Sequence, residues 1–298
     1  MTVESNFDAL LPHQMALKAE GIGIKKASMP FQNTLALAIL AGAFIALGSI
    51  FFTTVTAGSM PITGADGSTA FSTALPYGIT RLVGGLAFNL GLALVVIGGA
   101  ELFTGNNLIV MAYASGKISL PALLRNWGVV YLGNFIGSIL TALLMFVSKH
   151  YTYGKGTIGL NILTIGEAKT SLGFFQAIAL GILCNALVCL AVWLCYSARN
   201  TTDKIMAILL PITAFVAAGF EHSVANMYFI PEALFVKSWA GSAFFDLIHK
   251  TPLDFPHITW SNFLVANLLP VTIGNIIGGA VMVGLVYWFV YLREIKVN

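Results

Sequence analysis

The sequence predicts an all-α membrane protein of six transmembrane helices, built as two inverted three-helix repeats in which helices 2 and 5 are broken. Composition is the first observation: 57% of the 298 residues are hydrophobic and only 9% are charged, whereas soluble domains average about 25% charged residues. The apolar residues also gather into long segments. Two of these segments are interrupted by the same polar signature, which indicates an internal repeat.

Each predicted span follows from its length, because about 20 apolar residues cross the hydrocarbon core as a helix. The six segments that satisfy this are residues 34–57, 79–115, 122–148, 172–198, 204–236 and 261–292. The second and the fifth are longer than one crossing needs, so each is expected to consist of two half-helices joined by non-helical backbone. Such backbone is tolerated at membrane depth only where it is buried in protein or lines a cavity.

The two interruptions share the pattern G-x-E-x-x-x-x-N, at residues 99–106 and 219–226, with an offset of 120. A charge at the centre of a span costs ~2.5–3.5 kcal/mol on insertion scales. A matched pair of interrupted spans points to a transport site between two repeats. We expect the carboxylates to tie the broken segments together by accepting backbone N–H bonds. The polar residues assigned this structural role are Glu101, Asn106, Glu221 and Asn226.

The repeat extends beyond the breaks. Asn126, Gly133 and Asn134 in the third span recur in the sixth span at a constant offset of 141, and Gly42 in the first span matches Gly181 in the fourth. Small residues recur in any polytopic protein because they let helices approach closely, but a constant offset is harder to reach by chance. Three spans per copy is odd, so the second copy enters the membrane inverted.

Basic residues orient the chain and divide it. Lys and Arg favour the cytoplasmic side, and here they are enriched in the two short loops that are inner when both termini are cytoplasmic. We therefore expect an integral membrane protein with both termini cytoplasmic, with residues 1–30 as a cytoplasmic amphipathic segment, 31–292 as the transmembrane domain and 293–298 as a cytoplasmic tail. The loop at 58–78, rich in Gly, Ser, Thr, Pro and Ala, is expected to be an outer excursion.

The N-terminal segment carries an apolar stripe at helical spacing. The residues expected to form that stripe are Leu10, Leu11, Met15 and Ala19, with Lys18 and Glu20 outside it. This pattern suits a short helix on the cytoplasmic face. Two roles are open for it: an anchor on the membrane surface, or a plug or gate.

His222 is the only histidine inside a predicted span. An unperturbed imidazole titrates near ~6.5, and a titratable group in a helix break within the membrane is a functional-site hypothesis. Thr104 either donates to an anion near half-helix N-termini or bonds back onto its own helix. Asn185 is polar in an apolar run and needs a partner, for which His222 is a candidate. With no H-E-x-x-H pattern and no second intramembrane ligand at metal spacing, neither metal nor cofactor is expected.

Bulky apolar residues flank the two breaks, namely Phe88, Leu92, Leu102, Phe103 and Phe215. They are either ordinary core or, if they line a pore, narrow constrictions that resist bare ions because dehydration there is not repaid. An alternative from another class is a membrane-embedded enzyme that uses Glu221 and His222. No second catalytic group, coupled nucleophile or cofactor motif accompanies them, so an enzyme is not expected.

Long motifs at residues 100–104, 219–227 and 270–279 resemble the formate/nitrite transporter family, and the likeness covers nearly the whole chain. Residues 6–12 and 291–294 are most similar to the formate channels within it. The resemblance implies an aquaporin-like fold, a homopentamer with a separate pore in each protomer, and bidirectional passage of formate and other small monovalent anions. The loop at 58–78 looks longer than is usual in the family.

The resemblance also implies roles for particular residues. His222 is the central titratable residue that controls proton coupling, Thr104 and Asn185 are polar residues that lie near it, and Lys169 attracts anions. The apolar residues named above become constriction residues. The implied function is a pH-dependent formate channel, with nitrite or hydrosulfide as the alternative substrate. Protons, membrane lipid and a soluble partner of the N-terminal segment are the other partners expected, with no nucleic acid.

Overall fold

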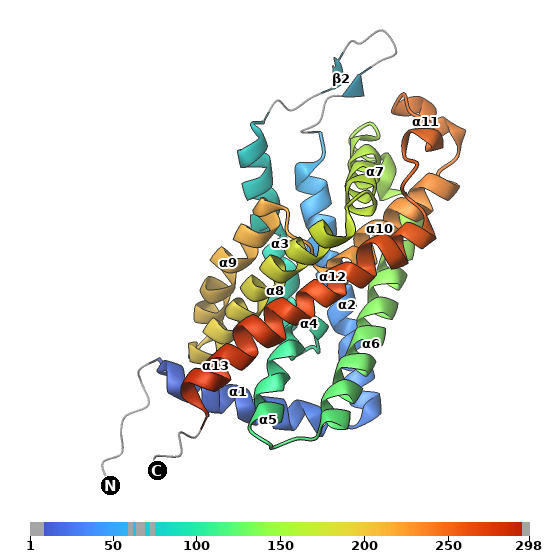
Figure 1. Cartoon of the computed structure of the whole chain (residues 1–298). Coiled ribbons are helices and arrows are strands. Elements are labelled where there is room, and N and C mark those ends of the chain that lie inside the picture. Colours follow the sequence, from blue (N-terminus) through green and yellow to red (C-terminus); the bar gives the residue numbers. More distant parts are fainter. Residues whose placement is uncertain (1–8, 59–61, 64–68, 72–74, 294–298) are drawn as a thin grey trace, which may run out of the picture.

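A computed structural model describes residues 9–58, 62–63, 69–71 and 75–293. Parts of three sequence predictions lie outside these residues: the start of the opening motif at 6–8, most of the outer loop, and all but the first residue of the C-terminal tail. The described residues form an inclined bundle of helices, with both of their ends at the same end of the bundle (Figure 1).

The first half contains the N-terminal helix, a first span, a broken second span and a third span. Its elements are α1 (Pro12–Ala27), α2 (Phe31–Thr56), α3 (Tyr77–Gly98), α4 (Phe103–Asn106), η1 (Asn107–Ile109), α5 (Val110–Ala114) and α6 (Leu120–Val147). Two short strands, β1 (Ile62–Thr63) and β2 (Thr69–Phe71), pair antiparallel between α2 and α3. This hairpin is the one departure from an all-helical chain among the described residues.

The second half repeats the plan of the first. Its elements are η2 (His150–Thr152), α7 (Thr157–Thr170), α8 (Phe174–Ser197), α9 (Thr201–Ala218), α10 (Ser223–Trp239), α11 (Ser242–Leu247), η3 (Pro252–Asp254), and a last span made of η4 (Asn262–Leu268), α12 (Leu269–Ile276), η5 (Ile277–Leu285) and α13 (Val286–Tyr291). Among the described residues, six helices are long and apolar enough to cross a membrane, one for each predicted span. The helix α7 lies in what the sequence predicted as a loop.

Both broken spans end their first half-helix in the same way. Gly99 and Gly219 adopt left-handed backbone, with φ of 76° and 78°. The next N–H groups reach back five residues, from Ala100 to Val95 O (2.9 Å) and from Phe220 to Phe215 O (3.0 Å). This is the Schellman C-cap, which glycine favours because it has no Cβ. The predicted breaks are therefore confirmed as two separate half-helices in each span.

Small residues in the third and sixth spans let the helices of each repeat touch. A Cβ at Gly137 would lie 2.0 Å from Ile39 O, and a Cβ at Gly278 would lie 2.1 Å from Ile182 O. These equivalent contacts give an offset of 141 for the third and sixth spans and 143 for the first and fourth. The predicted match of Gly42 with Gly181 is therefore wrong by one helical turn. Small residues recur every four positions along these helices, so the sequence alone allowed the slip.

The N-terminal helix packs on protein. The buried residues of α1 are Met15, Ala16, Ala19, Gly23 and Ala27, whereas Leu11 is 67% exposed. The predicted stripe is thus partly wrong, because Leu11 is the residue that precedes the helix and faces away from the bundle. A Cβ at Gly23 would lie 3.0 Å from Ala112 Cβ of α5. The helix α1 docks across one end of the bundle (Figure 1), and its role as an anchor or as a plug or gate stays a prediction.

Candidate functional site

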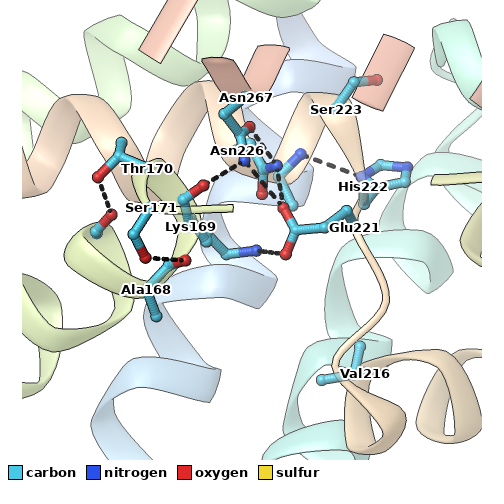
Figure 2. A network of polar contacts seen from close by, with 12 residues as sticks. Ala168, Lys169, Thr170, Ser171, Val216, Glu221, His222, Ser223, Asn226 and Asn267 are labelled. Atoms are coloured by element: carbon cyan, nitrogen blue, oxygen red, sulfur yellow. Dashed lines mark hydrogen bonds and ion pairs between the residues drawn. The ribbon is translucent and has the colours of Figure 1, made fainter. Parts of the chain in front are cut away.

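The break in the fifth span is held by a buried polar network around Glu221 (Figure 2). One carboxylate oxygen lies 2.8 Å from Lys169 Nζ of α7. The other accepts from the Nδ2 groups of Asn226 (2.6 Å) and Asn267 (3.2 Å). Asn275 joins both sides of the break: its Nδ2 donates to Glu221 O at 3.0 Å, and its Oδ1 accepts from Ser223 N at 2.9 Å.

The break in the second span has the same network built from repeat-related residues. Glu101 lies 3.1 Å from Lys26 Nζ of α1 and accepts from Asn106 Nδ2 at 2.7 Å. Asn134 donates to Glu101 O at 2.9 Å and accepts from Phe103 N at 2.9 Å. A salt bridge and a bridging amide therefore hold each break, at depths where an unpaired charge would be costly.

Both glutamates tie the breaks together as predicted, but by different donors. Side-chain amides and lysine ammonium groups, rather than backbone N–H groups, approach the carboxylates. The backbone N–H groups of the glutamates are themselves hydrogen-bond donors. Glu101 N donates to Leu37 O at 3.2 Å, and Glu221 N donates to Leu180 O at 3.3 Å. Each glutamate thereby fixes its break to the preceding span of its own repeat.

Removing an amide that bridges a break should destabilise the fold. We expect Asn275→Leu to leave two carbonyls and one N–H without partners, at ~1–3 kcal/mol for each buried group. The thermal midpoint in detergent should fall by on the order of 10 °C. Asn262→Leu is the matched control, because its Nδ2 makes one exposed bond to His257 O. Equal shifts of the thermal midpoint in the two variants would show that the buried hydrogen bonds of Asn275 contribute no more to stability than the exposed bond of Asn262.

His222 lies at the centre of the protein and begins α10. Its Nδ1 accepts from Ala225 N at 3.0 Å, so the ring caps that helix. Its Nε2 lies 2.8 Å from Oγ1 of Thr104, which lies in α4 of the broken second span. Because Nδ1 is occupied as an acceptor, the hydrogen-bond network assigns the proton of the neutral ring to Nε2. That proton donates to Thr104, which leaves the threonine hydroxyl hydrogen available to another acceptor.

Two cavities of about 250 Å³ approach this centre from opposite ends and share no lining residue. We name the cavities after the predicted orientation: the outer cavity contains the second break motif together with Lys169, Phe88, Phe215 and His222. The inner cavity contains the first break motif together with Leu92 and three lysines, one of which is Lys26. Each cavity therefore ends at one copy of the repeated polar signature.

Bulky apolar side chains line both cavities. On the outer side, Phe88 and Phe215 meet edge to face with ring centroids 5.7 Å apart, and the Phe215 ring lies 6.0 Å from His222. On the inner side, Leu92 and Leu102 are each 2% exposed and line the inner cavity.

Three predicted site residues line neither cavity, namely Thr104, Asn185 and Phe103. Asn185 Nδ2 donates to Asn107 Oδ1 (2.9 Å), Asn275 O (2.7 Å) and Thr104 O (3.3 Å). The suggested partnership of Asn185 with His222 is therefore wrong, and Asn185 instead supports the backbone that carries Thr104. Phe103 packs edge to face on Tyr131 at 4.9 Å, against α6.

The inner cavity carries positive charge that the sequence reasoning missed. Its charged lining residues are Lys18, Lys26, Lys204 and Glu101. Burial, followed by the charges of Lys204 and Arg199, lowers the pKa of Lys18 below its usual value. Lys26 and Lys169 are 143 residues apart, the offset of the first and fourth spans, so this register would have identified Lys26. Among the described residues, no three potential metal ligands gather into a metal site.

Comparison with known proteins gives matches along almost the entire chain. A family model described as formate/nitrite transporter matches residues 13–289. The formate channel FocA of Escherichia coli strain K12 is 46% identical over 294 residues, which cover 99% of each chain. Formate channel FocB of the same strain is 39% identical, covering 97% of this chain and 98% of the relative.

Solved structures show the same likeness in three dimensions. A structure titled "Pentameric formate channel with formate bound" matches with a TM-score of 0.80 and 45% identity, over 88% of this chain and 98% of that one. An "FNT family ion channel" matches with a TM-score of 0.75 and 29% identity, over 93% and 98% respectively. The predicted fold of two inverted repeats with two broken helices is thereby confirmed.

Proposed function

Because this chain belongs to the formate/nitrite transporter family, we propose that it is a bidirectional channel for formate whose central His222 couples passage to protons. One observation carries the proposal: two cavities with basic lining residues end at bulky apolar side chains, which form the proposed barrier, and the hydrogen-bonded pair of His222 and Thr104 lies at that barrier. A weak acid crosses such a barrier more readily as a neutral molecule than as a bare anion.

Entry into the pore is electrostatic. An anion is attracted to the cavities by their net positive charge, because basic residues outnumber the single glutamate in the lining of each. At the barrier the anion loses water and meets the hydroxyl hydrogen of Thr104, which the histidine leaves free. The hydrogen bond from Thr104 replaces part of the hydration that the anion loses before it meets the leucines or phenylalanines.

Proton coupling follows from the two nitrogens of His222. When the ring is charged, both nitrogens carry protons, so the ring no longer accepts the N–H of Ala225. The charged ring gives the Nε2 proton to the carboxylate; an O–H bond forms, the N–H bond breaks, and neutral formic acid and a neutral ring remain. The neutral ring regains the bond from Ala225 once its proton lies on Nε2. Proton transfer and the first turn of α10 are thus linked through one side chain.

The assembly and the orientation complete the proposal. The relative solved with formate is titled as a pentamer, and we propose a homopentamer here, with one pore in each protomer, in a bacterial inner membrane. The two described ends share one end of the bundle (Figure 1), as an even number of crossings requires. We place that end in the cytoplasm. Labelling of single cysteines near both termini in intact cells tests the orientation, and labelling from outside would reverse it.

Flux through purified protein tests the proposed substrate. Liposomes that contain the chain should take up formate far faster than protein-free liposomes, and the formate recovered should be chemically unchanged. Nitrite and hydrosulfide should be measured beside it at each pH, because the fold is compatible with either. Faster passage of one of these would select the alternative substrate, and a new chemical species in the lumen would revive the enzyme hypothesis.

A further inference from the structure

Lys169 is the basic residue of the outer cavity that the family resemblance marks, yet its charge is already matched. Its Nζ lies 2.8 Å from Glu221, and both side chains are largely buried. Neutralised in this way, the pair contributes little net field to the cavity (Figure 2). Besides His222, the charged residues that line this cavity are Arg81, Lys169 and Glu221, so its net positive charge comes from Arg81.

Arg81 is half-buried on α3 and is fixed by backbone oxygens. Its Nε donates to Ala217 O at 3.1 Å, and its Nη2 donates to Val216 O. These are terminal carbonyls of α9, whose negative dipole end favours a cation. The guanidinium also lies 5.6 Å from the centre of the Phe52 ring. Arg81 is therefore held in place without a carboxylate among the described residues.

Three of the five guanidinium N–H groups remain after these two bonds. No described residue accepts a hydrogen bond from them. A planar guanidinium with free N–H groups matches a carboxylate better than a lysine ammonium does, because two parallel N–H···O bonds can form. Arg81 is seven residues before Phe88 on the same helix, so it lies on the same face about 10 Å further out.

The inner cavity supplies an independent parallel. Lys204 lines it from the first turn of α9, the half-helix that corresponds to α3 in the other repeat. It also forms no ion pair among the described residues, whereas Lys26 is paired with Glu101. Each cavity thus contains one lysine paired with the break glutamate and a basic residue near the start of a half-helix that forms no ion pair among the described residues; the inner cavity also contains Lys18 of α1.

We propose that Arg81 is the anion-capture residue of the outer mouth, where it binds small carboxylates such as formate before they reach the phenylalanine pair. The Lys169–Glu221 pair is instead a structural clamp of the break. This inference rests on the proposed function only in taking formate as the anion. It assigns specificity for carboxylates to a residue outside the central barrier.

Equilibrium binding and uptake together test the assignment. Binding of ¹³C-formate to the solubilised protein should weaken on the order of tenfold in Arg81→Gln, and uptake by right-side-out vesicles at low formate should fall similarly. The uptake of Arg81→Gln should also lose most of its dependence on ionic strength, a property that a purely structural role would not move. Arg81→Lys should restore the ionic-strength dependence while binding formate more weakly than wild type. Lys155→Gln, an exposed outer charge outside the cavity, should behave as wild type.

The outcomes separate this inference from the proposed function. Unchanged binding and unchanged salt dependence in Arg81→Gln would overturn the assignment, as would equal losses in Lys155→Gln. An Arg81→Lys variant that behaves like Arg81→Gln would also overturn it, because charge would not be the cause. If wild type binds formate through Arg81 but does not transport it, the proposed function fails and the capture site stands.

Discussion

Replacing His222 by phenylalanine is expected to abolish formate uptake coupled to protons at acid pH while passive efflux survives. The variant keeps an aromatic ring beside Phe215 but removes both nitrogens, one of which lies 2.8 Å from Thr104. It also removes the cap on Ala225 N, which costs about 1 kcal/mol of helix stability. Uptake rates between about pH 5 and about pH 8, a range that brackets an ordinary imidazole pKa of ~6.5, are the measurement.

His222→Asn is the matched variant because it separates capping from titration. Asparagine is a good N-cap residue, so the bond from Ala225 should survive without a group that titrates. We expect this variant to transport formate with a flat response to pH. The sign is fixed by the chemistry: acid charges the imidazole, so only a protein with His222 should accelerate as pH falls. If both variants keep the wild-type profile, the histidine is structural and the mechanism is wrong.

Shortening the leucines on the inner side of the barrier should relax selectivity for size. Leu92 and Leu102 are almost fully buried and line the inner cavity. Discrimination by a single methylene is worth ~1–3 kcal/mol, or tenfold and more. Leu102→Ala and Leu92→Ala should therefore admit acetate at least on the order of tenfold better relative to formate, with lactate following. The measurement is uptake of each acid by liposomes.

Leu90→Ala is the control for this series. Leu90 lies on the same helix as Leu92 but is 41% exposed on the outside of the protomer. The same truncation there should leave the ratio of acetate to formate unchanged. Unaltered selectivity in both inner variants would remove these leucines from the pore lining, whatever Leu90→Ala does.

The fold could be predicted from the sequence because the repeat is marked by polar residues, which are rare within membrane-spanning segments. The pairs Glu101 with Glu221 and Asn134 with Asn275 mark equivalent contacts. The helix α7 was missed because its residues 157–170 mix apolar and polar side chains and include two glycines. This segment contains no apolar run long enough to span a membrane, so its hydropathy alone predicted a loop.

The site was predicted unevenly for a related reason. His222 and Thr104 come from spans far apart in sequence, and their contact depends on how the two breaks face each other. Asn185 was paired with the wrong partner because periodicity gives the face of a helix but not its depth relative to another repeat. Lys26 was overlooked because it lies in the N-terminal segment, where a lysine is ordinary and only tertiary packing brings it to Glu101.

The central claim is that a proton accompanies formate through the barrier at His222. The most direct test measures formate uptake and luminal pH together in liposomes that contain the wild-type chain, with a pH dye inside. At about pH 5, where an ordinary imidazole is charged, we predict that formate and protons enter together in a fixed ratio, and that this ratio is lost in His222→Asn. Formate entry without protons in wild type at that pH would contradict the account.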